Sequence, residues 1–150
     1  MMCLTFALLG CSTFSKKDCE TMDWGTKGYE AASNGQTAAG NLTYFQRECG
    51  AENGIQPNIM MFNKGYDDGL KSFCTADNGL RFGRGGGLYN NTCPVTLEKP
   101  FLEKYQLGRI EYTGTRIQEL ESQVSRLERE NADKERRIKE LQNRLNSMGQ

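Results

Sequence analysis

The clearest pattern of apolar positions lies in the carboxyl-terminal quarter of the chain, where they alternate in steps of three and four. Such sustained heptads with charged flanking positions indicate a coiled coil. A helix with so narrow an apolar stripe buries little by itself and should have a partner. Written as heptads, position a falls on Ile117, Val124, Asn131, Ile138 and Leu145, and position d on Leu120, Leu127, Lys134, Leu141 and Met148.

The residue types at these positions indicate the partner. β-branched residues at a with leucine at d favour a parallel two-stranded coil. Asn131 and Lys134 form one polar layer, which lowers stability but penalises trimers and shifted alignments. An antiparallel pair ranks lower because it sets the glutamates of position e against one another, namely Glu121, Glu128 and Glu135. The alternative to a partner is a tail that folds back on its own domain.

Upstream of the heptads, glycine and aromatic residues recur at helical spacing. Met61, Gly65, Gly69 and Phe73 lie four apart, on one face of a helix predicted from about Asn58 to Phe73. Because glycine costs a helix ~1 kcal/mol relative to alanine, its repetition on one face predicts close approach of another backbone. The same spacing recurs at Gly79, Gly83 and Gly87, although the run from Arg84 to Gly87 fits a flexible loop as well as a helix.

Other elements follow from capping and turn residues. Ser15 suits the N-cap of a first helix from about Lys16 to Ala32. Turns are predicted at residues 33–35 and 39–41, and a short helix at residues 42–49. Thr96 suits the N-cap of a helix that runs toward the carboxyl end, in which Gly114 is a weak point.

The amino-terminal run from Met1 to Leu9 is apolar and leads into Gly10 and Cys11. The sequence Leu8-Leu9-Gly10-Cys11 resembles the lipobox of bacterial lipoproteins, which implies lipidation of Cys11 and attachment by more than one acyl chain. Ser12, rather than an aspartate, follows the cysteine. In Gram-negative lipoproteins this similarity would imply sorting to the outer membrane. Secretory signals are usually longer and open with a positive charge, so we expect the true start to lie upstream. The alternative is an ordinary apolar helix start with a buried thiol at Cys11.

Four cysteines remain in the glycine-rich part of the chain: Cys19, Cys49, Cys74 and Cys93. An even number in a small exported domain predicts two disulfides. Three pairings are possible. We favour the sequential one, Cys19 with Cys49 and Cys74 with Cys93, because it closes loops of roughly 20 to 30 residues, each worth ~3 kcal/mol. A four-cysteine zinc site is the alternative, although such sites usually bring their ligands in close pairs.

Composition argues against several classes of function. Lys plus Arg equals Asp plus Glu at 19 each, so no charge excess attracts nucleic acid or an anionic surface. Histidine is absent, which removes the commonest general base and metal ligand. A hydrophobic content of 37% with 17 glycines predicts a small core. We therefore expect no enzyme activity, catalytic residue, cofactor or metal.

The order of cysteine, glycine and aromatic residues resembles the bacterial lipoproteins grouped as domain of unknown function 2799. The resemblance covers about residues 11–112 and implies no activity or ligand. It rests on Cys19, Asp23-Trp24, Gly28, Cys49, Phe62-x-x-Gly65-Tyr66-x-x-Gly69-Leu70, Phe73-Cys74-Thr75, Asn78-Gly79, Gly83, Tyr89, Cys93-Pro94, Phe101, Tyr105 and Gly108.

Together these patterns predict a mainly α protein with three parts. Residues 1–10 are a signal peptide, residues 11–112 a disulfide-stapled, glycine-rich helical domain, and residues 113–150 a coiled coil. We expect a lipid-anchored protein on the periplasmic face of a Gram-negative outer membrane. Its coil would form a homodimer or meet another envelope protein, with no nucleic-acid partner. The alternative function is a periplasmic binding module for a cell-wall fragment or peptide.

Overall fold

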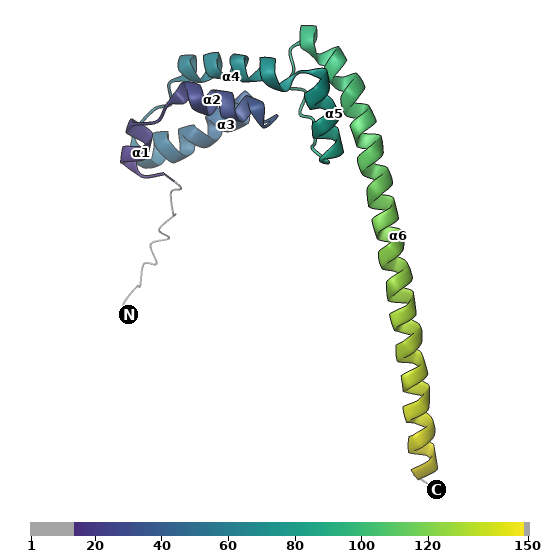
Figure 1. The fold of residues 1–150 in the computed structure, drawn as a ribbon. Coiled ribbons are helices and arrows are strands. Elements are labelled where there is room, and N and C mark those ends of the chain that lie inside the picture. The colour runs from purple at the N-terminus through teal and green to yellow at the C-terminus, as the bar shows by residue number, and fades with distance from the viewer. Residues whose placement is uncertain (1–13, 149–150) are drawn as a thin grey trace, which may run out of the picture.

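The computed structural model describes residues 14–148, and every regular element in that range is helical (Figure 1). The predicted mainly α fold, a small helical domain followed by a long helix, is confirmed. None of the described helices is both long and apolar enough to cross a membrane. The elements are α1 (Lys16–Glu20), α2 (Trp24–Ser33), α3 (Ala38–Phe45), the π-helical turn η1 (Gln46–Ala51), α4 (Ile59–Phe73), α5 (Ala76–Arg84) and α6 (Val95–Met148).

Local capping decides where the amino-terminal helices begin and end. The predicted helix from Lys16 to Ala32 is wrong in one respect, because the chain breaks it into α1 and α2. The Asp23 carboxylate accepts the backbone N–H groups of Gly25 and Thr26, at 2.9 and 3.1 Å, and so starts a new helix at Trp24.

Two further local predictions need correction for the same reason. Thr37 caps α3 by accepting the backbone N–H of Gly40, so residues 39–41 are helical and do not form the predicted turn. The predicted short helix at residues 42–49 is divided between α3 and the wider turn of η1, which carries Cys49. The turn predicted at residues 33–35 is present, with Gly35 at a φ of 68°.

Two helix pairs form the centre of the fold, and the helices of each pair cross closely at glycines. In the first pair, α2 crosses α4, and a methyl group on Gly65 would lie 1.8 Å from the carbonyl oxygen of Gly25. The reciprocal position, Gly28, would lie 1.9 Å from the carbonyl oxygen of Phe62. Only glycine permits this approach, so the predicted close crossing of helices is confirmed.

The second pair repeats the arrangement with α5 and the first part of α6. A methyl group on Gly83 would lie 2.4 Å from the carbonyl oxygen of Tyr105, and one on Gly108 would lie 2.4 Å from that of Leu80. Helix α5 ends at Arg84, and Gly86 adopts a φ of 77°. Arg84 is therefore helical, whereas Gly85 to Gly87 lie outside the helix.

Aromatic side chains fill the space around both crossings and connect them. Phe62, at the start of α4, packs edge-on against Phe45 with ring centroids 6.2 Å apart. Phe73, at the end of α4, packs against Phe101 of α6 with centroids 5.1 Å apart. All four rings are buried, and α4 therefore links one aromatic cluster to the other.

Two buried disulfides reinforce this small core. Cys19 is bonded to Cys49, which ties α1 to η1, and Cys74 is bonded to Cys93, which ties the end of α4 to the segment before α6. This is the sequential pairing that the sequence analysis favoured. Because all four thiols are used in disulfides, the zinc alternative is wrong.

Tyr89 lies beside the second disulfide, and its titration is expected to change the stability of the domain at high pH. Its hydroxyl donates to Glu98 at 2.9 Å and accepts the backbone N–H of Cys93 at 3.0 Å. Burial is the main reason that its pKa rises to about 12, whereas an unfolded tyrosine has a pKa of about 10. As pH rises, the unfolded state therefore loses this proton first, which favours unfolding.

The stability that Tyr89 contributes should be complete below about pH 10 and should disappear as pH rises from about 10 to about 12. A Tyr89→Phe variant should start less stable, since the Cys93 N–H loses its acceptor, but should decline less over that window. Urea unfolding midpoints measured across the window check this expectation. An equal decline in both proteins would contradict it.

Candidate functional site

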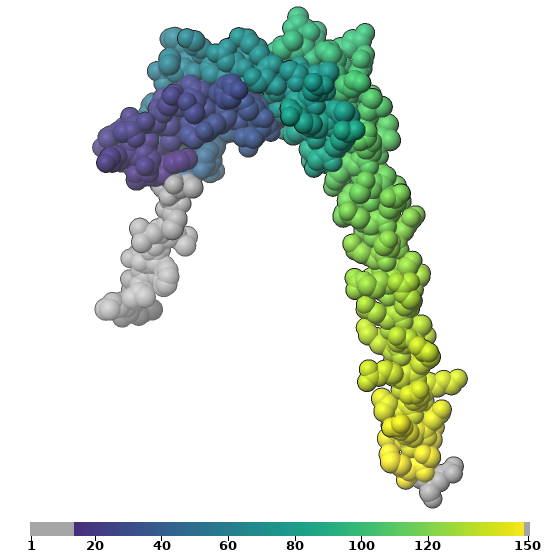
Figure 2. Space-filling model, viewed as in Figure 1, coloured from purple at the N-terminus to yellow at the C-terminus, as the bar shows by residue number. Residues whose placement is uncertain are grey.

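The largest exposed feature of the described chain is the part of α6 that projects beyond the domain (Figures 1 and 2). The helix continues through Gly114, which the sequence had marked as a weak point, and every residue from 113 to 148 is exposed. The alternative of a tail folded back on its own domain is therefore wrong. The long arm has a surface of its own.

A row of apolar side chains follows this arm. These are the predicted core residues of the coil, and each is at least 49% exposed, an unusual state for large aliphatic side chains. Asn131 and Lys134 interrupt the row as its polar layer. Its apolar members are Ile117, Leu120, Val124, Leu127, Ile138, Leu141, Leu145 and Met148, and we call this row the seam.

Ion pairs along the helix support the arm without covering the seam. Arg126 and Glu130 lie 3.1 Å apart, and Arg116 pairs with Glu119. Each such exposed pair contributes only a few tenths of a kcal/mol to an isolated helix. The seam is the larger unused source of stability, because hiding the exposed half of one aliphatic side chain contributes ~1 kcal/mol.

The surface of the seam is hollowed at a regular position. One hollow is bordered by Ile117, Leu120, Glu121 and Val124, at positions a, d, e and the next a, and also by Ser125 and Glu128. In a coiled coil, each core side chain enters a hole formed by four residues of the facing helix. Four residues that border this hollow occupy the heptad positions that form such a hole.

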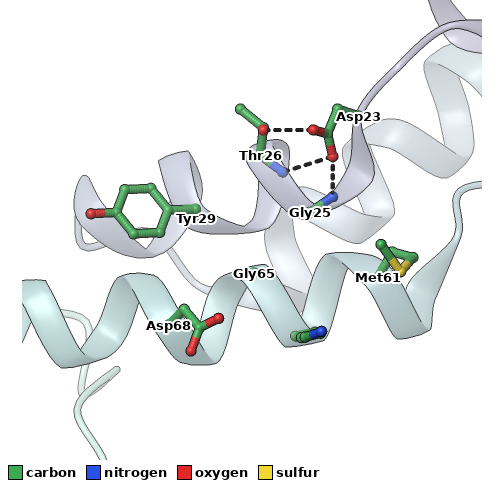
Figure 3. Close-up of a pocket in the computed structure, with 8 residues that line it drawn as sticks. Asp23, Gly25, Thr26, Tyr29, Met61, Gly65 and Asp68 are labelled. Carbon is green, nitrogen blue, oxygen red and sulfur yellow. Dashed lines mark hydrogen bonds between the residues drawn. The ribbon is translucent and has the colours of Figure 1, made fainter.

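A second hollow lies between α2 and α4, at their glycine crossing (Figure 3). The pKa of Asp23 is lowered by hydrogen bonds from Thr26, of which the one from its backbone N–H has the largest effect. A hydrogen bond from Lys71 at 2.7 Å lowers the pKa of Asp68. Both carboxylates are therefore already engaged by their own helices. The polar side chains of this hollow are Asp23, Thr26, Tyr29, Lys64 and Asp68.

Sequence reasoning did not identify this second hollow. Its residues come from two helices separated by about thirty-five positions in the chain, and no local spacing brings them together. The aromatic and glycine pattern predicted a close crossing, but not which helices cross. By contrast, all seam residues belong to one helix, so their heptad spacing alone placed them on one face.

The remaining predicted site residues are cysteines, and none of the described ones lines either hollow. Cys11 lies outside the described residues. The four bonded cysteines are buried, so their part is to hold the domain together. Among the described residues, no group of three or more His, Cys, Asp and Glu side chains could hold a metal ion.

Comparison with known proteins gives one match. A family described as "Protein of unknown function (DUF2799)" matches residues 23–110. No curated protein and no solved structure matches the chain. The matched range contains both glycine crossings and three of the four bonded cysteines, whereas the seam lies beyond it.

Proposed function

This chain belongs to the DUF2799 family of proteins of unknown function, and we propose that it is a lipid-anchored envelope protein that self-associates through its C-terminal coiled coil. Its task is structural: the coil joins two helical domains at one membrane surface. We propose no enzymatic activity for it. The single observation that carries the proposal is the exposed seam, which no described part of its own chain covers.

The composition of the seam favours a second copy of the same chain over an unrelated partner. Ile117, Val124 and Ile138 at position a, with leucine at d, fit a parallel two-stranded coil. In that arrangement the Asn131 side chains of the two chains meet and can hydrogen-bond to each other, which sets the register. Arg116 would also face Glu121 of the second copy.

The position of the first described residues supports anchoring close to the membrane. Phe14 packs against Phe45 with ring centroids 6.0 Å apart, and its carbonyl oxygen accepts a hydrogen bond from Asn53 at 3.1 Å. Three residues of chain span at most ~11 Å. A lipidated Cys11 would therefore hold this end of the domain directly at the bilayer surface, where confinement also raises the local concentration for dimerisation.

Self-association predicts a specific loss when the seam is made polar. In the full chain carrying Cys11→Ala, to keep it unacylated, Leu120→Glu with Leu127→Glu should raise the dimer dissociation constant about 100-fold or more. Ser122→Glu, at an exposed position on the opposite face, is the matched control and should leave the dimer intact. Sedimentation velocity at micromolar concentration measures both, and a monomeric parent would contradict the proposal.

Lipid anchoring predicts that one cysteine alone carries the fatty acid. Cells expressing the parent should incorporate labelled palmitate into the protein and retain it in the membrane fraction. Cys11→Ala should abolish both, while Cys3→Ala, the other cysteine of the amino-terminal segment, should change neither. Label retained by the Cys11→Ala variant would overturn the assignment.

The hollow between α2 and α4 favours a second candidate function, a periplasmic binding module for a cell-wall fragment or peptide. Trp24, the only tryptophan of the chain, stands next to Gly25 in that hollow and reports on its occupancy. Titration with a soluble muramyl pentapeptide, followed by Trp24 fluorescence, tests this function. A saturable change lost in Tyr29→Ala would favour it, and an unchanged signal would leave the dimer as the function.

A further inference from the structure

The heptad pattern of α6 continues one repeat further toward the domain than the sequence analysis placed it. Ile110 lies seven residues before Ile117 and therefore at position a, and Thr113 lies at position d. Ile110 is 67% exposed although it belongs to the part of α6 that packs against α5. The preceding core positions, Glu103 and Gln106, are polar, so the pattern begins at Ile110.

This part of α6 has two opposite faces with different uses. Its contacts with α5 include those of Phe101, Tyr105 and Gly108, which lie at heptad positions f, c and f. Positions c and f point away from a and d on a helix. Helix α5 therefore occupies the back of α6, and the face that carries Ile110 and Thr113 is open to a second helix.

A hollow on that open face repeats the one found on the seam. Besides Arg109 at position g, it is bordered by Ile110, Thr113, Gly114 and Ile117, again at positions a, d, e and the next a. It lies exactly one heptad before the hollow formed by Ile117, Leu120, Glu121 and Val124. Two hollows bordered by the same heptad positions, one heptad apart, match the repeat of knobs-into-holes packing.

Gly114 distinguishes this first hollow from the next. A methyl group at the crossing glycines of α2, α4, α5 and α6 would meet the backbone of a neighbouring helix, whereas one on Gly114 would meet no other described part of the chain within 4 Å beyond its own turns of α6. A glycine in a helix without a compensating contact costs ~1 kcal/mol relative to alanine. The missing side chain leaves the hole open at its e position, where an opposing helix can enter.

We propose that the dimer interface extends into the folded domain, with Thr113 of the second copy in this hollow and the two Ile110 side chains against each other. The inference rests on the proposed coiled-coil dimer and adds that the coil is joined rigidly to the two helical domains. The ion pair of Arg84 with Glu111 and the crossing at Gly108 hold this segment of α6 on α5. The two domains are therefore held side by side, and do not hang from a flexible joint.

Single added cysteines test this extension, because a disulfide needs Cα atoms ~4.4–6.8 Å apart, which facing a positions provide. Three variants of the full chain with Cys11→Ala are oxidised mildly and run on a non-reducing gel: Ile110→Cys, Val124→Cys and Thr115→Cys. Thr115, at position f, is the matched control. We expect covalent dimers from Ile110→Cys and Val124→Cys, and at least about ten-fold less from Thr115→Cys.

The outcomes separate this inference from the function on which it rests. Cross-linking at Val124 without cross-linking at Ile110 would overturn the extension and leave the coiled-coil dimer intact. Cross-linking at neither position, with a dimeric mass in sedimentation, would show an antiparallel pair and overturn the extension. Cross-linking at neither position, with a monomeric mass, would overturn both.

A second measurement uses affinity in place of cross-linking. Ile110→Glu should raise the dimer dissociation constant at least about ten-fold, whereas Thr115→Glu should change it less than about two-fold. Both variants should retain the helical circular dichroism of the domain, because both side chains are exposed. Equal affinities for the two variants would overturn the extension.

Discussion

Replacing Gly65 with alanine should lower the free energy of unfolding of the domain by about 3 kcal/mol. The new methyl group would lie 1.8 Å from the carbonyl oxygen of Gly25, far inside the contact distance of two non-bonded heavy atoms. Backbone atoms cannot turn aside as a side chain can, so α2 and α4 would have to separate. That separation would also loosen the packing of Phe62 and Tyr66, which lie on the same helix and are buried.

A matched substitution shows whether the close crossing is the cause. Gly85 follows α5 with a φ of −75°, and a methyl group there would have its nearest neighbour at 3.5 Å, an ordinary contact. Gly85→Ala should therefore change the free energy of unfolding by less than about 0.5 kcal/mol. Urea unfolding followed by circular dichroism measures both variants, and equal losses would contradict the explanation.

Removing the disulfide between Cys74 and Cys93 should lower the free energy of unfolding by a comparable amount, and should also change the number of unfolding transitions. The chain-entropy contribution of its loop is ~3 kcal/mol. Helices α4 and α5 make few contacts with each other, so the main links between the two helix pairs are this disulfide and the packing of Phe73 against Phe101 and Phe82. We expect Cys74→Ala with Cys93→Ala to lower stability and to split unfolding into two transitions.

The other disulfide serves as the control for this prediction. Cys19→Ala with Cys49→Ala frees α1, which has few contacts with the other helices, and should cost a similar amount through a loop of similar length. Unfolding of that variant should remain a single transition, since both links between the helix pairs are kept. Calorimetry distinguishes the two cases. A single transition in both variants would show that aromatic packing alone couples the pairs.

Sequence spacing was sufficient for features that one helix contains by itself. The seam from Ile117 to Met148 could be predicted because residues three and four apart share a face whatever the rest of the chain does. The glycines at 65 and 69 were likewise recognised as a close-approach face. The sequential disulfide pairing was favoured from loop length, because it closes loops of roughly 20 to 30 residues, each worth ~3 kcal/mol.

Predictions failed where two local signals competed. The stretch from Lys16 to Ala32 has no proline and reads as one helix, yet the Asp23 carboxylate captures the N–H groups of Gly25 and Thr26 and starts a new one. Thr37 does the same for α3. Capping groups of this kind were present in the sequence, but their effect depends on which backbone groups the packed chain leaves free.

For this protein, the sequence alone determined that the fold is helical, that glycine faces meet backbone, and that the end of the chain carries an apolar stripe. Those properties follow from helical periodicity, which needs no contact with a distant residue. Only the tertiary structure decided that α2 crosses α4, that α5 takes the back of α6, and that Ile110 stays exposed on its front. These depend on contacts between residues far apart in the chain, whose free energies no local spacing contains.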